Sequence, residues 1–399
     1  MRVNVTRKGN AAEVLAAFTK LGLTSFGGPV AHIGYFRREF VERRQWLDDT
    51  EFARVLALCQ FLPGPASSQM GFSVGLLRAG WAGAFAAFVA FTLPSALLMF
   101  AFATMLPALQ GGAGQAAMHG LKLVAVAVVA QGVMNMARQL CPDAARASIA
   151  VMGAALVLVS GLPWMQLVVV AGGALAGLAA CRSVKPPAGS PLRPPYGIGM
   201  GSMLVALFVL LLFGLPLLAR AQGGMSAVVE AFYRSGALVF GGGHVVLPLL
   251  RDTVVTPGWV SNDDFLAGYG AAQAVPGPMF SFASYLGARL PGNEGGALGS
   301  TVAVLSIFLP GLLLVAGTLP LWRVVADHPL AARAVAGVNA AVVGLLAAAL
   351  YDPVWTGAIR GPVDVAIAAI AFTLLVAWRA SPLLAVAWCV VAAVAAGAV

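Results

Sequence analysis

The stretch LGLTSFGGPVAHIGYF, residues 21–36, places two adjacent glycines and a proline in the middle of an apolar run. Both residue types interrupt an α-helix, because glycine favours non-helical backbone and proline lacks an amide donor. Apolar runs of about 20 residues, the length needed to cross about 30 Å of hydrocarbon, recur along the chain. The sequence therefore predicts a helical membrane protein in which some helices are broken.

Composition excludes a soluble protein and a membrane β-barrel. Hydrophobic residues make up 60% of the 399-residue chain and charged residues only 10%, whereas soluble domains carry about 25% charged residues. The apolar runs do not alternate with polar residues as barrel strands would. The net charge of +9 is what basic cytoplasmic loops give a membrane protein, so it does not predict nucleic-acid binding. The expected fold class is an all-α polytopic membrane protein.

The chain repeats itself. Three motifs occur twice, in the same order and at nearly constant separation: FGGPV (26–30) and FGGGH (240–244), QFLPGP (60–65) and QAVPGP (273–278), and FTLPS (91–95) and IFLPG (307–311). This agreement predicts a duplication. An odd number of apolar segments separates equivalent positions, so the second half is inverted if every segment crosses. Inverted repeats are a recurrent transporter plan, with the substrate site near the middle of the membrane.

The predicted division of the chain has four parts: an N-terminal transport repeat (1–181), a proline-rich cytoplasmic linker (182–197), a connecting transmembrane helix (198–222) and a C-terminal transport repeat (223–399). If every segment crossed, the arginines between residues 37 and 54 would face outside, against the positive-inside rule. Re-entrant hairpins on the FGGP and PGP segments remove this conflict. We therefore expect about nine crossing segments and about four re-entrant ones. We also expect an interfacial helix over 37–54, with Trp46 at headgroup level.

The two glycine breaks are the first candidate site: Gly27, Gly28 and Pro29 in the first half, and Gly241, Gly242, Gly243 and His244 in the second. Broken backbone at membrane depth is tolerated only where protein buries it or a wet cavity adjoins it. The helix that starts after each break presents free N–H groups and a positive dipole end, which favour an anion. The alternative is a plain kink or a close helix contact.

The two PGP tips are the second candidate site: Pro63, Gly64 and Pro65, followed by Ser67 and Ser68, and Pro276, Gly277 and Pro278, followed by Ser281. Proline suits the first turn of a helix, and hydroxyl groups there can donate to a ligand. Gln60 and Gln273 precede the tips at equal offsets and are either structural residues or ligand contacts. Two breaks in each half, placed by symmetry, favour one central binding site over independent kinks.

Three basic residues are further candidates. Lys122 lies in an apolar run, and its partner in the other half is Asn339. A lysine inside a membrane is costly, so it predicts a functional role unless its side chain extends to the interface. Arg37 and Arg251 follow the two breaks. They are either clamps for a dianion or anchors for lipid headgroups.

Motifs for other chemistry do not occur. The chain has no GxxxxGK[ST] phosphate loop, which excludes an ATP-driven pump unless a partner subunit supplies the motor. Its four cysteines occur singly, without metal-ligand spacing. No nucleophile and base occur together in a convincing motif. We therefore predict no enzyme activity, no cofactor and no metal site.

The FGGP motif, the basic and aromatic stretch that ends in a tryptophan, and the PGP motif, all repeated in the second half, resemble the chromate transporter (CHR) family in its long two-domain form. The resemblance covers nearly the whole chain. It implies a multi-pass protein of the bacterial inner (plasma) membrane that exports chromate and gives chromate resistance, with sulfate as competitor or exchange partner. It makes the breaks and tips the leading site, and FGGGH in place of FGGP implies unequal half-sites. A homodimer is left open.

Export of a dianion from a cell with a negative interior is favoured by about 4.6 kcal/mol per 100 mV, so it can proceed as a uniport. We expect chromate to bind the N–H groups and hydroxyls of the broken helices while Lys122 balances its charge. Rocking of the repeats would then release it. The alternatives are a transporter or exchanger of sulfate or another anion, an anion channel, and an intramembrane enzyme.

Overall fold

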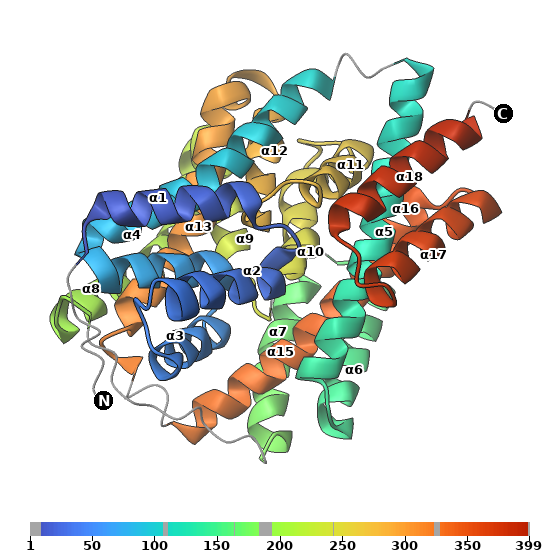
Figure 1. Cartoon of the computed structure of the whole chain (residues 1–399). Coiled ribbons are helices and arrows are strands. Elements are labelled where there is room, and N and C mark those ends of the chain that lie inside the picture. The colour runs from blue at the N-terminus through green and yellow to red at the C-terminus, as the bar shows by residue number, and fades with distance from the viewer. Residues whose placement is uncertain are drawn as a thin grey trace.

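The structure is a computed structural model that describes residues 9–106, 111–162, 164–182, 194–241, 243–322 and 328–397. All regular secondary structure in these ranges is helical, which confirms the all-α class. The helices pack into one bundle with many short elements near its centre (Figure 1). Large hydrophobic side chains such as Leu210 and Val159 are exposed on its surface, as a lipid-facing surface requires.

Five helices are long and apolar enough to cross a membrane: α4 (Ala66–Met105), α5 (Gly112–Leu140), α8 (Ile198–Gln222), α13 (Gly296–Thr318) and the helix that begins with α15 (Pro329–Ala349). Four further segments form apolar helices of 15 to 17 residues: α6 (Ala144–Ser160), α7 (Met165–Ala180), α17 (Pro362–Val376) and α18 (Pro382–Gly397). At about 1.5 Å per residue these reach about 25 Å, short of the hydrocarbon thickness of about 30 Å. The expectation of nine crossing segments therefore stays a prediction for these four.

The FGGP segment folds as a helical hairpin. α1 (Ala11–Thr24) ends before the first glycine break, and α2 (Gly28–Arg37) runs back beside it (Figure 1). The first PGP segment turns back in the same way, from α3 (Asp49–Phe61) into the first part of α4. α4 then bends at Ala79 and Gly80, where the backbone is not helical. Its second part, residues 81–105, is long enough to cross the hydrocarbon.

The expected interfacial helix over 37–54 is wrong. α2 continues into a wide turn of π-type, η1 (Arg38–Arg43), and the chain then bends before α3. Asp48 starts α3, because its side chain accepts the Glu51 amide at 2.7 Å. Trp46 is 5% exposed and stacked on Phe40, and its position at headgroup level stays a prediction.

The second half is built from similar elements: α9 (Met225–Ala237), a 3-10 turn η3 (Gly243–Val245), α10 (Val246–Leu250), a π-type turn η4 (Arg251–Val255), α11 (Asn262–Ala272) and α12 (Phe282–Ala288). The two halves exchange their last helices. α6 and α7 pack on α15 of the second half, whereas α17 and α18 pack on α5 of the first. Small residues allow these contacts, since Gly337 lies against the backbone of Gly173 and Gly177.

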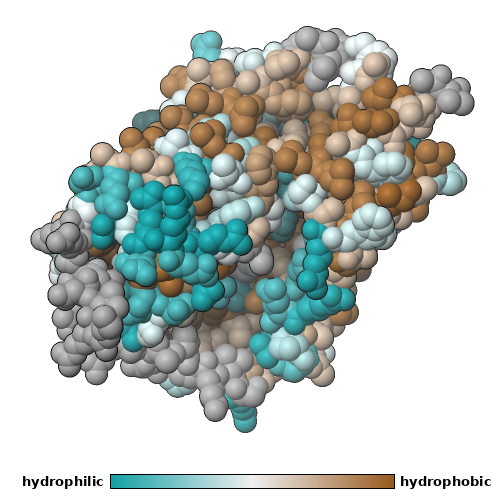
Figure 2. All heavy atoms as spheres, in the orientation of Figure 1, coloured by the Kyte–Doolittle hydropathy of each residue, from teal (hydrophilic) through white to brown (hydrophobic). Residues whose placement is uncertain are grey.

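Hydrophilic residues gather over α2, η1 and α3 on one flank of the molecule, while hydrophobic residues cover much of the rest of this face (Figure 2). This flank includes exposed Arg37, Arg43 and Asp49. Its charge agrees with a position at the cytoplasmic end of the bundle under the positive-inside rule.

Candidate functional site

The four broken segments meet in pairs at the centre of the bundle. The amide of Gly277, in the second PGP tip, donates to the carbonyl of Ser25 beside the first glycine break, at 2.9 Å. The amide of Gly64, in the first tip, donates to the carbonyl of Val239 beside the second break, at 2.7 Å. Each tip therefore bonds to the break of the other half, and the two bonds join equivalent positions of the repeat.

The first glycine break has the geometry that its sequence predicts. Gly27 and Gly28 have φ angles of 100° and 74°, in the left-handed region that favours glycine. Pro29 occupies the first turn of α2, where its missing N–H is not needed. No side chain caps α2, so its first N–H groups have no helical partner.

The second glycine break is built differently. Gly241 has a φ of 74°, Gly242 lies outside the described residues, and Gly243 begins the 3-10 turn η3. The regular helix that follows, α10, has only five residues, against ten in α2. His244 Nδ1 is hydrogen-bonded to the Tyr269 hydroxyl at 2.9 Å, and the imidazole packs against Gly132 of α5. This contact gives His244 a structural partner, as a packing residue would have.

Both PGP tips turn on a glycine with positive φ, 121° at Gly64 and 99° at Gly277. The flanking Pro65, Pro276 and Pro278 are buried and Pro63 is half-buried. A β-carbon on Gly64 would lie 3.0 Å from Gly311 Cα, and one on Gly277 would lie 3.0 Å from Ser95 Oγ. Each tip is therefore pressed against the FTLPS or IFLPG stretch of the other half.

The serines after the tips lie in the first turns of the following helices. Ser67 and Ser68 are buried in α4, and Ser68 Oγ has no hydrogen-bond partner among the described residues. Ser281 Oγ instead donates to the Pro278 carbonyl at 2.7 Å. The Ser68 hydroxyl beside the first tip is therefore available to a ligand, whereas the Ser281 hydroxyl is already hydrogen-bonded within the second tip.

The glutamines before the tips do not reach the centre as a pair. Gln60 is exposed at the end of α3, and its role as a ligand contact stays a prediction. Gln273 bonds within its own helix, to the Tyr269 carbonyl at 3.3 Å. Gln69 takes the central position, since its amide nitrogen donates to the carbonyls of Pro63 and Gly311 at 2.8 and 3.0 Å. Sequence reasoning missed Gln69, although it lies within the same apolar helix as the tip.

Lys122 is buried and paired. It is 4% exposed, and its ammonium lies 2.7 Å from an Asp263 carboxylate oxygen at the start of α11. It therefore does not extend freely to the interface. α11 has 11 residues and is about 16 Å long, so Asp263 lies at the end of this helix away from the second tip. The repeat partner, Asn339, lies instead beside Gly241, and its side-chain oxygen has no partner among the described residues.

A cavity of about 770 Å³ adjoins Lys122, between α5, α11, α17 and α18. Its wall also carries Arg289, bonded to Asp264 at 3.0 Å, and His119, bonded to Asp364 at 2.8 Å. The Lys122–Asp263 and His119–Asp364 contacts each join the first half to the second. The cavity wall therefore carries charged groups from both repeats.

Arg37 is exposed and Arg251 is half-buried, and each forms an ion pair with a carboxylate. Arg37 is paired with Asp49 at 2.9 Å and Glu42 at 3.0 Å. Arg251 lies 3.9 Å from Asp352. The structure does not bring either arginine to the breaks. Both are instead paired with acidic residues.

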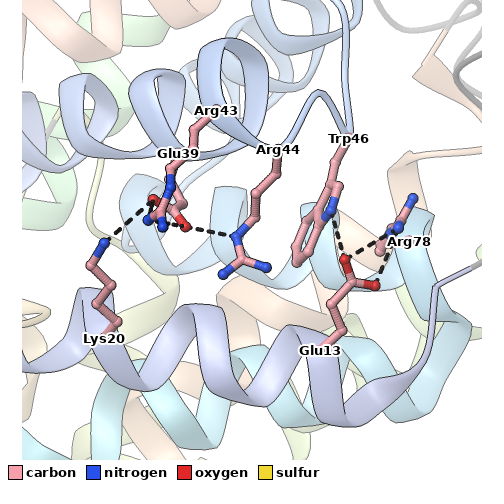
Figure 3. A network of polar contacts seen from close by, with 7 residues as sticks. All are labelled: Glu13, Lys20, Glu39, Arg43, Arg44, Trp46 and Arg78. Atoms are coloured by element: carbon pink, nitrogen blue, oxygen red, sulfur yellow. Dashed lines mark hydrogen bonds and ion pairs between the residues drawn. The ribbon is translucent and has the colours of Figure 1, made fainter.

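A polar network connects the ends of three segments on the charged flank (Figure 3). Glu39 of η1 accepts from Arg44 at 2.6 Å and Arg43 at 3.1 Å, and lies 3.8 Å from Lys20. Burial disfavours the charged form of Glu39, but the hydrogen bonds from Arg44 and Arg43 outweigh it and lower the pKa of the carboxyl below its ordinary value of 4.5.

The second part of this network lies around Glu13, near the start of α1 (Figure 3). Its carboxylate accepts from the Trp46 indole at 3.1 Å and from Arg78 at 3.2 Å. Glu13 near the start of α1 therefore contacts both Trp46, which follows η1, and Arg78 at the end of the first part of α4. The hairpin of α1 with α2 and the hairpin of α3 with the first part of α4 lie between these residues in the sequence. Each hairpin returns to the end of the bundle at which it starts, as the re-entrant interpretation requires.

These features define the class of protein: a helical membrane protein in which broken helices from two halves meet at the centre, the construction of secondary transporters. A family model described as chromate transporter matches residues 12–178 and 226–398. The chain therefore belongs to the chromate transporter family.

Individual relatives agree with this assignment. A probable chromate transport protein of Synechococcus elongatus is 30% identical over 338 residues, which cover 84% of this chain and 82% of the relative. Chromate transport proteins of Pseudomonas aeruginosa and Cupriavidus metallidurans are 28% and 27% identical, over 92% and 85% of this chain and 87% and 81% of their own lengths. No solved structure gives a significant match.

Proposed function

We propose that this protein exports chromate from the cytoplasm across the bacterial inner membrane and so gives resistance to it. The observation that carries the proposal is the pair of reciprocal hydrogen bonds between tips and breaks. A substrate path between them would lie at the interface of two repeats, and small rotations of one repeat against the other would open it to either side.

We propose an inverted arrangement of the repeats, and the two ends of α13 support it. The C-terminal end of α13 lies beside the flank where repeat one begins, since the Tyr196 hydroxyl donates to Ala316 at 2.6 Å and its ring stacks on Trp81. The start of α13 follows Glu294, which lies beside Gly224 at the entrance of α9. With 23 residues α13 is about 35 Å long, enough to separate the two entrances by a bilayer.

The cavity at Lys122 then lies at the outer end of the path. A dianion that arrives there competes with the Asp263 carboxylate for the Lys122 ammonium. Release of Asp263 loosens one of the polar contacts that join the repeats at this end. Lys122 thereby couples the presence of the anion to the opening of the outer side.

Energetics favour export over uptake. Outward movement of a dianion is assisted by about 4.6 kcal/mol per 100 mV of membrane potential, negative inside. Sulfate has the same charge and tetrahedral shape, so it competes for the same site. The chain supplies this path without enzyme chemistry.

Uptake of labelled chromate into everted membrane vesicles tests the proposal. Vesicles that carry the protein should accumulate chromate above empty vesicles when their interior is positive, and excess sulfate should reduce the uptake. Gly277→Leu should abolish it, because the larger side chain separates the tip from Ser95. Gly214→Leu is the matched control, since Gly214 of α8 has no neighbouring atom within 4 Å of its β-position. Uptake no greater than that of empty vesicles would refute chromate export.

A further inference from the structure

Three buried polar atoms at the first glycine break lack partners. Ser25 Oγ, His32 Nδ1 and Thr92 Oγ1 have no hydrogen bond among the described residues. Ser25 and His32 are 0% exposed and Thr92 is 3% exposed. Unpaired polar groups in the interior are unfavourable and rare, so such a group in a native fold calls for an explanation, for example a bound ion.

His32 contacts the two segments that carry the other two residues. His32 lies in the second turn of α2, and its Nε2 is 3.2 Å from the Ser25 carbonyl, so the imidazole folds back over the break. The ring meets Phe91 of α4 edge-on, with centroids 5.4 Å apart. Thr92 follows Phe91, and Ser95 donates to its carbonyl at 2.9 Å. α2 thus begins beside a group of polar side chains.

The chemistry of the cluster suits an anion. The two hydroxyl groups can donate, and the uncapped start of α2 adds backbone N–H groups and a positive dipole end. His32 donates through Nε2 to the Ser25 carbonyl and so holds the break, while its Nδ1 is an acceptor in the neutral ring. The ten residues of α2 make a full helix, unlike the five of α10. The donors therefore have no counterpart of equal strength in the second half.

The equivalent positions of the second half are apolar. Val239 stands in place of Ser25, Val246 in place of His32, and Phe308 in place of Thr92 in the FTLPS and IFLPG alignment. All three are fully buried. The second half keeps a glycine break without these polar groups, so the break itself does not require them. A structural role in the repeat does not account for the polar cluster.

We propose that the chain holds one oxyanion, at the first glycine break only, bound by Ser25, Thr92 and the start of α2, with His32 as a positioning residue for the break, while the second break carries none. This inference rests on the proposed function and assigns its substrate site to one half. The second PGP tip covers the site, because Gly277 donates to the Ser25 carbonyl and lies against Ser95. Movement of that tip would admit or release the anion.

The test compares two double variants of the purified protein in proteoliposomes. Ser25→Ala with Thr92→Val removes both hydroxyls with little change of shape. Ser160→Ala with Thr301→Val is the matched control, because it removes the same two kinds of hydroxyl from α6 and α13, away from the breaks and tips. Chromate KM and the melting temperature with and without sulfate are measured for each. Replacing unpaired hydroxyls by apolar groups should leave the melting temperature without ligand unchanged or raise it.

We expect the first double variant to raise the KM for chromate by about tenfold or more, because charged hydrogen bonds are lost, and the second to leave KM within about twofold. An unchanged KM in the first variant overturns the proposal. If the unaltered protein transports no chromate, the proposed function fails. The melting temperature with and without sulfate then tests the anion site by itself. Stabilisation by sulfate in the unaltered protein but not in the Ser25→Ala, Thr92→Val variant supports the site, and equal or absent stabilisation overturns it.

Discussion

The amide of Gly277 donates to the carbonyl of Ser25 at 2.9 Å, which joins the tip of one repeat to the break of the other. The equivalent bond joins Gly64 to Val239. Contacts that recur with the two partners exchanged are what a two-fold relation between repeats produces. They place both glycine breaks and both PGP tips in one region, which makes that region the natural place for a substrate path.

The tip glycines should not tolerate a side chain. Gly64→Ala and Gly277→Ala each place a β-carbon at positive φ and within 3.0 Å of the other half. We expect a loss of about 1–3 kcal/mol in each case, because left-handed backbone is unfavourable for alanine and the tip must shift. Thermal unfolding in detergent measures the loss. Gly214→Ala should have the opposite effect, since alanine favours helix at a position without neighbours. Equal stability of all three variants would contradict the tip geometry.

Lys122 and Asp263 should be energetically coupled. Their 2.7 Å contact joins the two repeats, with Lys122 buried and Asp263 on the cavity wall. Lys122→Met and Asp263→Asn should each destabilise the fold, and the double variant should lose less than the sum, with a coupling energy of about 1 kcal/mol or more. Chromate flux should fall about tenfold in Lys122→Met and be largely kept in Lys122→Arg. Additive single effects would show that the pair contributes nothing.

The Glu39 network should make stability depend on acid pH. The pKa of Glu39 is lowered in the folded protein, so its contribution is present above its ordinary value of 4.5 and is lost as the pH falls through the folded value. The melting temperature should therefore drop below about pH 4.5, and Glu39→Gln should reduce this dependence by about 1 kcal/mol or less. A pH profile from 3 to 7 for both proteins is the measurement. Identical profiles would mean that the network in Figure 3 does not stabilise the fold.

The inverted arrangement makes opposite predictions for the two repeats. Asp49, at the start of α3, and Asn293, before α13, are both exposed. In a background without the four native cysteines, Asp49→Cys should react with an impermeant maleimide only in everted vesicles. Asn293→Cys should react only in spheroplasts. Labelling of both from one side would show that the repeats are parallel.

Local backbone rules were enough to predict the breaks and tips, because consecutive glycines and the PGP sequence restrict the chain whatever surrounds it. The motifs repeated in the two halves also led to the correct family, because they resemble those of the chromate transporter family. Which tip contacts which break could not be predicted, since it depends on packing between halves. Gln60 in α3 and Gln69 in α4 have the same side chain, and only the packing of these helices determines that Gln69 points inward. The pairing of Lys122 with Asp263 was missed because its partner lies far away in the sequence.

The central claim is that the tips and breaks of the two repeats must separate for chromate to pass. A disulfide between Ser95→Cys and Gly277→Cys tests it most directly, because the β-positions lie 3.2 Å apart, close to the distance of about 3.8 Å in disulfides. Chromate flux is measured in one preparation, oxidised and then reduced, in a background without the native cysteines. Flux that is lost on oxidation and restored by reduction is the predicted result. Flux that is equal in both states, with the disulfide fully formed, would contradict the claim.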